Sequence, residues 1–113
     1  MSAPLVSKRS TAERDLLEHF VLLGTRAGEA RALRFLQAAE DTFAALAARP
    51  LMGRAADFNH PRLTGMRRWR VRDFENYLIF YFPRDHGVEI VRVVYGTRDL
   101  PGLLFAEEPD SRP

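Results

Sequence analysis

The chain has 113 residues, 46% of them hydrophobic and 28% charged, so we expect a single domain over 1–113 and no multi-domain enzyme. The absence of cysteine excludes disulfide scaffolds, thiolate metal sites and cysteine nucleophiles. The net charge is only +2, but residues 62–72 hold five arginines and no acidic residue, whereas residues 106–113 form an acidic tail that we expect to be flexible.

The first half of the chain has the apolar spacing of two helices. Ser10 and Glu13 have the spacing of a capping box, and apolar residues recur every three or four positions up to Leu23. This spacing predicts a helix over 11–23. An alanine-rich second stripe predicts another helix of about 20 residues that ends before Pro50. The short connection between the two favours an antiparallel helix hairpin.

The second half has the patterns of β-strands. Residues 66–73 alternate arginines with apolar side chains, residues 76–82 are apolar on both faces, and residues 88–95 are rich in β-branched side chains. These patterns predict a three-stranded antiparallel sheet with the helix hairpin on one face, to which an N-terminal strand over 5–8 can add. The predicted fold class is therefore α+β. Residues 98–105 are compatible with a helical turn or with an extended tail.

The central strand predicts which apolar side chains form the core. Because the hairpin covers only one face of the sheet well, we expect the other face to be partly exposed, or covered by the C-terminal segment or a partner. The face expected to be available comprises Leu78, Phe80 and Phe82. The core on the opposite face is expected to comprise Trp69, Val71, Ile79 and Tyr81 from the strands, and Leu16, Phe20, Leu36 and Phe43 from the helices.

The sequence contains no motif of conventional catalysis. His19, His60 and His86 lie far apart, and none has a second metal ligand at a suitable spacing. Each is therefore expected to be a surface residue, and neither a metal nor a cofactor is expected. Serine hydrolase and phosphate-loop motifs are missing as well.

The strongest candidate for a functional feature is a series of arginines on one predicted strand. Arg68, Arg70 and Arg72 alternate along it, and strand spacing would aim all three guanidinium groups to the same side. Such an arrangement is unfavourable without an anion, and arginine binds carboxylates and phosphates through two parallel hydrogen bonds. The alternative interpretation is a row of ordinary solvated arginines.

Five segments follow one another in an order that resembles the RelE/ParE toxin superfamily, most closely its ParE branch, from about residue 5 to residue 104. They are AERDLL at 12–17, RPLMG at 49–53, MRRWRV at 66–71, YLIFY at 77–81 and VRVVYGTRDL at 91–100. The resemblance implies the toxin of a type II toxin–antitoxin pair, held inactive by a ParD-type antitoxin. The implied target is DNA gyrase in the ParE branch and messenger RNA on the ribosome in the RelE branch.

The residues of this chain distinguish between the two branches. The resemblance implies that RelE-type cleavage needs basic groups on one strand, an arginine on the next, another arginine after the last strand and an aromatic hydroxyl near the end. Arg70 and Arg72 can supply the first groups, and Arg98 the arginine after the last strand. The other two positions hold Leu78 and Leu104, and neither can carry a charge or transfer a proton. The sequence therefore favours a non-enzymatic toxin that inhibits gyrase by binding. A ribosome-dependent endoribonuclease is the enzyme alternative, and a small arginine-rich nucleic-acid-binding domain is the alternative outside the toxins.

The expected partners are thus a ParD-type antitoxin and DNA gyrase in the cytoplasm, without direct nucleic-acid binding. The longest apolar run, 77–82, is too short to cross a bilayer, and no membrane partner is expected. The residues expected to contact a partner are Arg68, Arg70, Arg72, Leu78, Phe80, Phe82, Arg98, Leu103 and Leu104.

Overall fold

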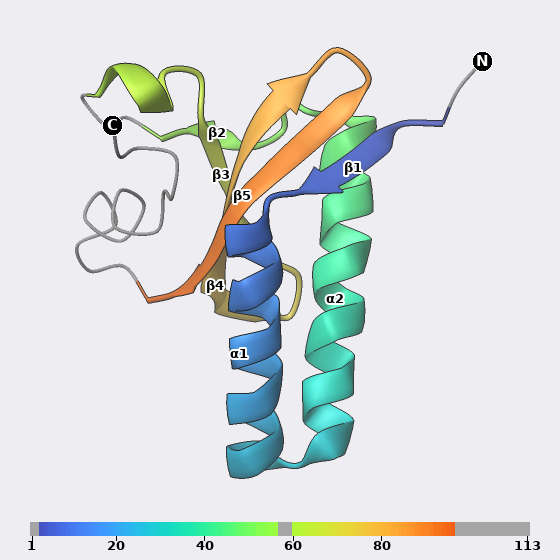
Figure 1. The fold of residues 1–113 in the computed structure, drawn as a ribbon. Helices are drawn as coiled ribbons and strands as arrows, with labels where there is room; N and C mark the ends of the chain where they lie inside the picture. Colours follow the sequence, from blue (N-terminus) through green and yellow to red (C-terminus); the bar gives the residue numbers. More distant parts are fainter. Residues whose placement is uncertain (1–2, 57–59, 97–113) are drawn as a thin grey trace.

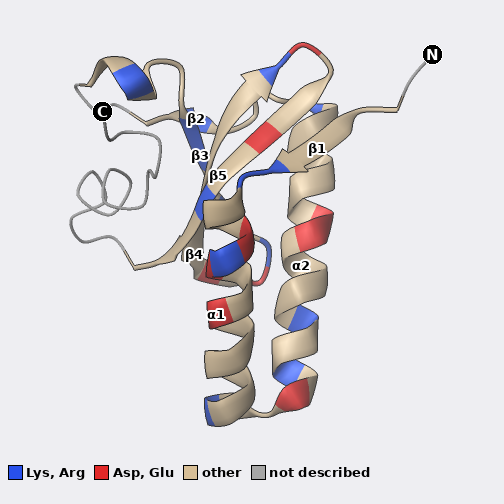
Figure 2. Cartoon of the chain, viewed as in Figure 1, with Lys and Arg blue, Asp and Glu red and all other residues tan. Residues whose placement is uncertain are grey.

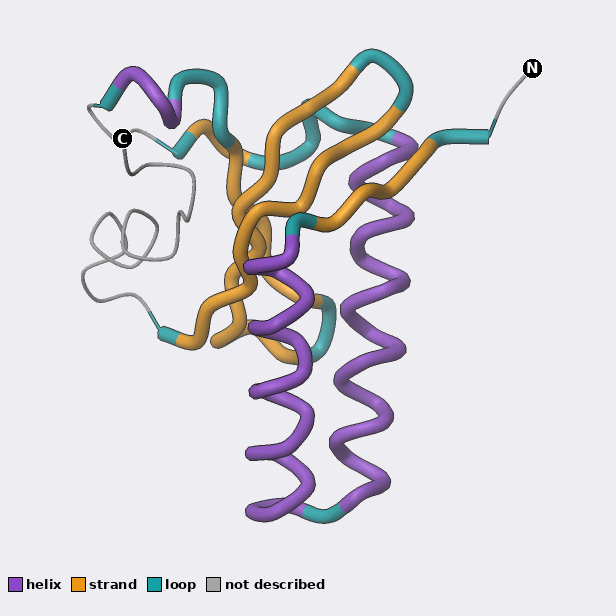
Figure 3. The backbone as a smooth tube through the Cα atoms, in the orientation of Figure 1, coloured by secondary structure: helices purple, strands orange, loops and turns teal. Residues whose placement is uncertain are grey.

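A helix hairpin and a five-stranded sheet make up the fold in the computed structural model, which describes residues 3–56 and 60–96 (Figure 1). The elements in chain order are β1 (Leu5–Lys8), α1 (Ser10–Ala27), α2 (Glu29–Ala48), β2 (Arg54–Ala55), the 3-10 turn η1 (Pro61–Leu63), β3 (Arg67–Val71), β4 (Phe74–Arg84) and β5 (Gly87–Tyr95). Figure 3 shows the two helices side by side on one side of the sheet. The predicted α+β class is confirmed.

The sheet has the strand order β1-β5-β4-β3-β2. β1 pairs with β5 in parallel, and the other pairs are antiparallel. The three predicted strands and the N-terminal strand are therefore present, whereas the two-residue strand β2 was not predicted. β4 and β5 are longer than predicted, because Arg84 pairs with Gly87 and only two residues remain in the turn. Residues 98–105 lie outside the described part of the chain.

Both predicted helices are present, with different ends. α2 has the expected 20 residues, but α1 begins at Ser10 and runs to Ala27. The predicted capping box is wrong: Arg9 is the N-cap residue, and no side chain caps the helix. The reason is that the Arg9 N–H still donates to Ile90 of β5 while its carbonyl already accepts from Glu13, so the chain passes from strand to helix without a linker.

The main core lies between the hairpin and the sheet. Most of the side chains predicted for it are buried there, namely Leu16, Phe43, Val71, Ile79 and Tyr81. Phe20 and Leu36 are half-buried. Trp69 is 36% exposed, so its predicted place in the core is wrong. It lies on β3, where pairing with β2 covers only the first two residues and leaves the rest of the strand beside an open groove.

The opposite face of the sheet is also covered. Leu78, Phe80 and Phe82 are 4%, 0% and 7% exposed, so the prediction of partial exposure is wrong. They form a second cluster with residues that the segment from β2 to β3 brings over this face, including Leu63 and Met66. The sequence showed the apolar face of the strand but not the short turn η1 that helps to cover it.

Side chains of α1 bind the edge of β5 where β1 ends. The Thr11 hydroxyl donates to Val91 O at 2.8 Å, the Val93 N–H donates to Asp15 Oδ2 at 2.9 Å, and a ring nitrogen of His19 lies 2.8 Å from Val93 O. His19 and His60 are half-buried, so their predicted surface positions are wrong, whereas His86 is exposed as predicted. One side of α1 thus supplies the hydrogen bonds that a further strand would supply.

The Asp15 carboxylate also forms a buried ion pair with Arg92 of β5. Arg92 Nε donates to Asp15 Oδ2 at 2.6 Å and Nη2 donates to Oδ1 at 2.9 Å, and both side chains are 8% exposed. Such a pair contributes little by itself, because both groups lose their hydration. Its loss is costly, because one charge is then buried alone.

We expect Asp15→Asn to lower the free energy of unfolding by about 3 to 5 kcal/mol, because Arg92 stays buried without its counter-charge. Urea denaturation followed by circular dichroism measures the effect. The matched control is Glu18→Gln, an exposed position on the same helix, which should change the stability by less than about 0.5 kcal/mol. An Asp15→Asn protein that unfolds at the wild-type urea concentration would contradict the assignment.

Candidate partner-binding groove

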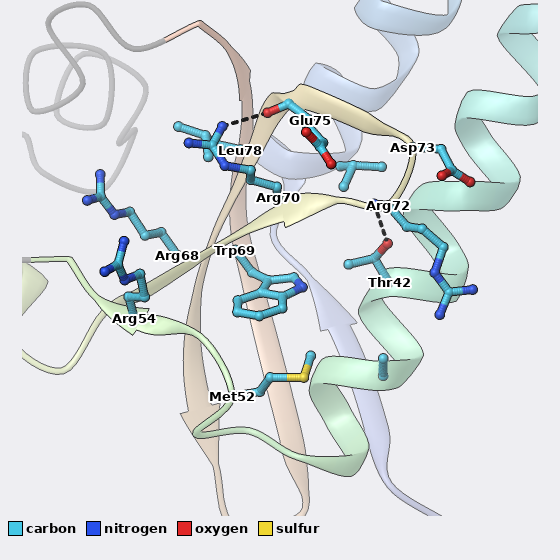
Figure 4. A pocket seen from close by; sticks show the side chains of 12 residues that line it. Thr42, Met52, Arg54, Arg68, Trp69, Arg70, Arg72, Asp73, Glu75 and Leu78 are labelled. Carbon is cyan, nitrogen blue, oxygen red and sulfur yellow. Dashed lines mark hydrogen bonds between the residues drawn. The ribbon is translucent and has the colours of Figure 1, made fainter.

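A groove of about 590 Å³ runs between β3 and the C-terminal half of α2 (Figure 4). Its lining residues come from α2, from residues 52 and 54, from β3, and from the turn into β4. They are Thr42, Ala45, Met52, Arg54, Arg68, Trp69, Arg70, Val71, Arg72, Asp73, Glu75 and Leu78. The volume is in the range of pockets that bind small ligands or the side chains of a partner.

The apolar part of the groove includes an aromatic ring beside a thioether. Figure 4 shows the Trp69 ring pointing toward Met52. Trp69 is 36% exposed and Met52 is half-buried. A large aromatic ring that is accessible from one side is a typical anchor for a binding partner.

Two arginines lie directly opposite each other at one end of the groove. Arg54 of β2 and Arg68 of β3 are partners in the strand register, and both are exposed. Like charges at directly opposite positions destabilise a strand pair. Among the described residues, neither guanidinium has a hydrogen bond or an ion pair. Figure 2 shows the basic residues along these two strands. The pair is therefore suited to an anionic group of a partner.

The other two arginines of the series are placed differently. Arg70 Nη1 donates to the backbone oxygen of Glu75 at 2.7 Å. A register shift follows Arg70, and Arg72 then lies on the side of α2, where its N–H donates to the Thr42 hydroxyl at 3.1 Å. Figure 4 shows Arg68 and Arg70 directed to one side and Arg72 to the other. The prediction that all three arginines point the same way is therefore wrong for Arg72.

A buried tyrosine fixes the loop that carries Met52 and Arg54 to the groove. The Tyr81 hydroxyl donates to Pro50 O at 2.7 Å and accepts from Gly53 N at 2.9 Å. A Cβ at Gly53 would collide with this hydroxyl and with a backbone oxygen of β3, so only glycine fits. Burial raises the pKa of the Tyr81 phenol, which keeps it protonated, and able to donate, at neutral pH.

The other predicted site residues are Leu78, Phe80, Phe82, Arg98, Leu103 and Leu104. Leu78 lines the groove with little exposure, and Phe80 and Phe82 are buried on the second face of the sheet. Arg98, Leu103 and Leu104 lie outside the described residues. Arg54 and Met52 were not among the predicted site residues, although they lie in or next to the RPLMG segment.

Other exposed apolar side chains lie on the two helices of the hairpin. Leu17 and Val21, one turn apart on α1, are 63% and 57% exposed, and Leu33 of α2 is 52% exposed. We call these three residues the hairpin stripe. In the described part of the chain no group of side chains is arranged to hold a metal ion, and none of its helices is long and apolar enough to cross a membrane.

The structure defines a small domain in which a helix hairpin packs on a five-stranded sheet, with a groove that exposes arginines and a tryptophan. A model of the ParE toxin of the type II toxin–antitoxin system parDE matches residues 6–100. The chain therefore belongs to the ParE toxin family, and the predicted resemblance is confirmed.

Comparison with solved structures supports the same fold. A chain of the chromosomal ParDE toxin–antitoxin system from P. aeruginosa is similar, with a TM-score of 0.67 and 15% sequence identity. The match covers 85% of this chain and 100% of that chain. At this identity the likeness concerns the fold alone. No curated protein sequence gives a significant match.

We expect Tyr81→Phe to destabilise the protein by about 1 to 3 kcal/mol, because the buried Gly53 N–H and Pro50 carbonyl lose their common partner. Thermal unfolding checks this. Tyr95→Phe is the control, since Tyr95 is 61% exposed and its hydroxyl can remain in water. Equal melting temperatures for Tyr81→Phe and the wild type would show that the loop does not depend on this hydroxyl.

Proposed function

We propose that this ParE toxin acts by binding rather than by catalysis, that DNA gyrase is its target, and that a ParD-type antitoxin neutralises it in the cytoplasm. The observation that carries the proposal is the Arg54–Arg68 pair. Two opposed guanidinium groups without an ion partner among the described residues lie beside an accessible tryptophan. This arrangement suits an acidic protein segment with apolar residues between its carboxylates.

The antitoxin would contact the groove through two kinds of interaction. Its carboxylates would pair with Arg54 and Arg68, which relieves the repulsion between these two residues. Its apolar side chains would pack on Trp69 and Met52, where burial of apolar surface supplies most of the affinity. Arg70 and Arg72 can add charge at the rim. Contacts to residues 98, 103 and 104 remain predictions.

The hairpin stripe provides the second surface for the antitoxin. Leu17 and Val21 have the one-turn spacing at which a helix presents an apolar row. An amphipathic helix can bury such a row together with Leu33, as helices do in the apolar grooves of their receptors. An antitoxin with an acidic, amphipathic C-terminal half would satisfy the groove and the stripe together.

The position of Leu78 supports binding over cleavage. In the RelE branch this position is expected to supply an arginine, whereas here it holds a side chain that is 4% exposed. An apolar group gives no stabilisation to the negative charge that develops on phosphate during cleavage. The groove retains arginines but lacks a charged group at this point.

We expect Arg54→Ala to have opposite effects on stability and on antitoxin binding. Removal of one of two opposed charges should stabilise the free toxin by about 0.2 to 1 kcal/mol. The same change should weaken antitoxin binding by about 1 to 3 kcal/mol, because an interfacial ion pair is lost. Calorimetric unfolding and isothermal titration measure the two effects.

The matched control is Arg34→Ala, an exposed arginine of α2 outside the groove, which should leave both quantities at wild-type values. The wild-type affinity should also fall more steeply with salt than that of Arg54→Ala, because fewer charges pair in the variant. If Arg54→Ala bound the antitoxin as tightly as the wild type, the groove would be excluded as the site that binds acidic side chains of the antitoxin.

Two assays with the wild-type toxin test the function itself. Inhibition of gyrase-catalysed supercoiling, reversed by antitoxin, is the expected result. Cleavage of messenger RNA on ribosomes would instead establish the endoribonuclease alternative. Binding to duplex DNA with a steep salt dependence would favour a nucleic-acid-binding role.

A further inference from the structure

Leu51 is an exposed leucine on a fixed loop. Its side chain is 68% exposed, the highest value among the large hydrophobic residues of the described chain. It lies between the end of α2 and β2 but is not part of the groove lining. Nothing in the core or in the groove accounts for an apolar side chain at this point.

The backbone is held on both sides of Leu51. Pro50 O and Gly53 N bind the Tyr81 hydroxyl, Arg67 Nη1 donates to Gly53 O at 2.6 Å, and Met52 N donates to Arg49 O at 2.9 Å. A loop that is already ordered loses little conformational entropy on binding, so more of the contact energy appears as affinity. The loop therefore presents Leu51 as a preorganised anchor.

The surroundings of Leu51 are basic. Residues 42–56 contain no acidic residue, and Arg49 and Arg54 flank the leucine in the sequence. Arg54 in turn faces Arg68 on the neighbouring strand. A partner that accepts Leu51 must therefore combine an apolar pocket with carboxylates at the rim of that pocket, since basic side chains there would be repelled by the arginines.

We propose that Leu51 is the anchor by which the toxin binds its target, and that it enters an apolar pocket of that protein surrounded by acidic side chains. The inference rests on the proposed function in one respect, namely that the target is a protein. The position of Leu51 also explains how the antitoxin would neutralise the toxin. Met52, the next residue, lines the groove, so an antitoxin segment bound in the groove would lie beside Leu51 and block the approach of the target.

The test uses the full-length toxin with Leu51→Asp and the milder Leu51→Ala. The readouts are the toxin concentration that half-inhibits gyrase supercoiling, the growth arrest caused by the toxin in bacterial cells at matched protein levels, the antitoxin dissociation constant and the melting temperature. Leu22→Asp is the control, because Leu22 is an exposed leucine of α1 (47%) outside the groove. Leu51→Asp should raise the half-inhibitory concentration about tenfold or more, as expected for loss of an interface anchor.

The outcomes test the role of Leu51 and the identity of the target separately. If wild-type toxin inhibits gyrase and both Leu51 variants inhibit it equally well, the anchor is excluded and the gyrase target stands. If wild-type toxin leaves gyrase unaffected, the target is wrong, and growth arrest decides: relief by Leu51→Asp but not by Leu22→Asp supports the anchor, and undiminished arrest excludes it. Should Leu51→Asp lower the melting temperature, Leu51→Ala gives the decision.

Discussion

The carboxylate of Asp15 connects the helix hairpin to the sheet. It accepts hydrogen bonds from the Arg92 guanidinium and from the Val93 N–H, at the point where β1 has ended and the edge of β5 would otherwise be open. These bonds fix α1 against the sheet, and through the one-residue connection at Gly28 they also place α2. Because α2 forms one wall of the groove, the geometry of the groove depends on the contact between Asp15 and β5.

The short edge strands β1 and β2 cover β5 and β3 over only part of their length. Where β1 has ended, polar side chains of α1 bind backbone groups of β5 at Val91 and Val93, so these groups are not available for pairing with a further strand. The β3 edge is covered by β2 over only two residues and is then open to the groove. At this open part of β3, an accessible tryptophan and two opposed arginines lie near a loop held by Tyr81. The proposed partner would therefore meet groups that are already held in place.

Periodicity in the sequence was sufficient to predict the helix hairpin, the strands β3, β4 and β5, and the basic character of β3. It was insufficient where a side chain's environment depends on distant segments. Strand alternation predicted Trp69 in the core, but the groove beside α2 leaves it 36% exposed. It predicted Leu78 on an available face, but residues before β3, such as Leu63 and Met66, help to cover that face. The register shift after Arg70 separates Arg72 from Arg68, which a strict period of two cannot show. Asp15 and His19 have the spacing of an ordinary solvated helix face, so their bonds to β5 were not recognisable.

The pairing of β1 with β5 also determines when during synthesis the fold can form. The contacts that complete the sheet join residues far apart in the chain, such as Ser7 with Val88 and Asp15 with Arg92, which are 81 and 77 positions apart. Contacts between residues so far apart in the chain slow folding, because a long loop must close before they form. On the ribosome, α1 and α2 emerge long before their partner strand is synthesised. A nascent or truncated chain that ends before β5 therefore cannot complete the sheet, because β5 lies between β1 and β4.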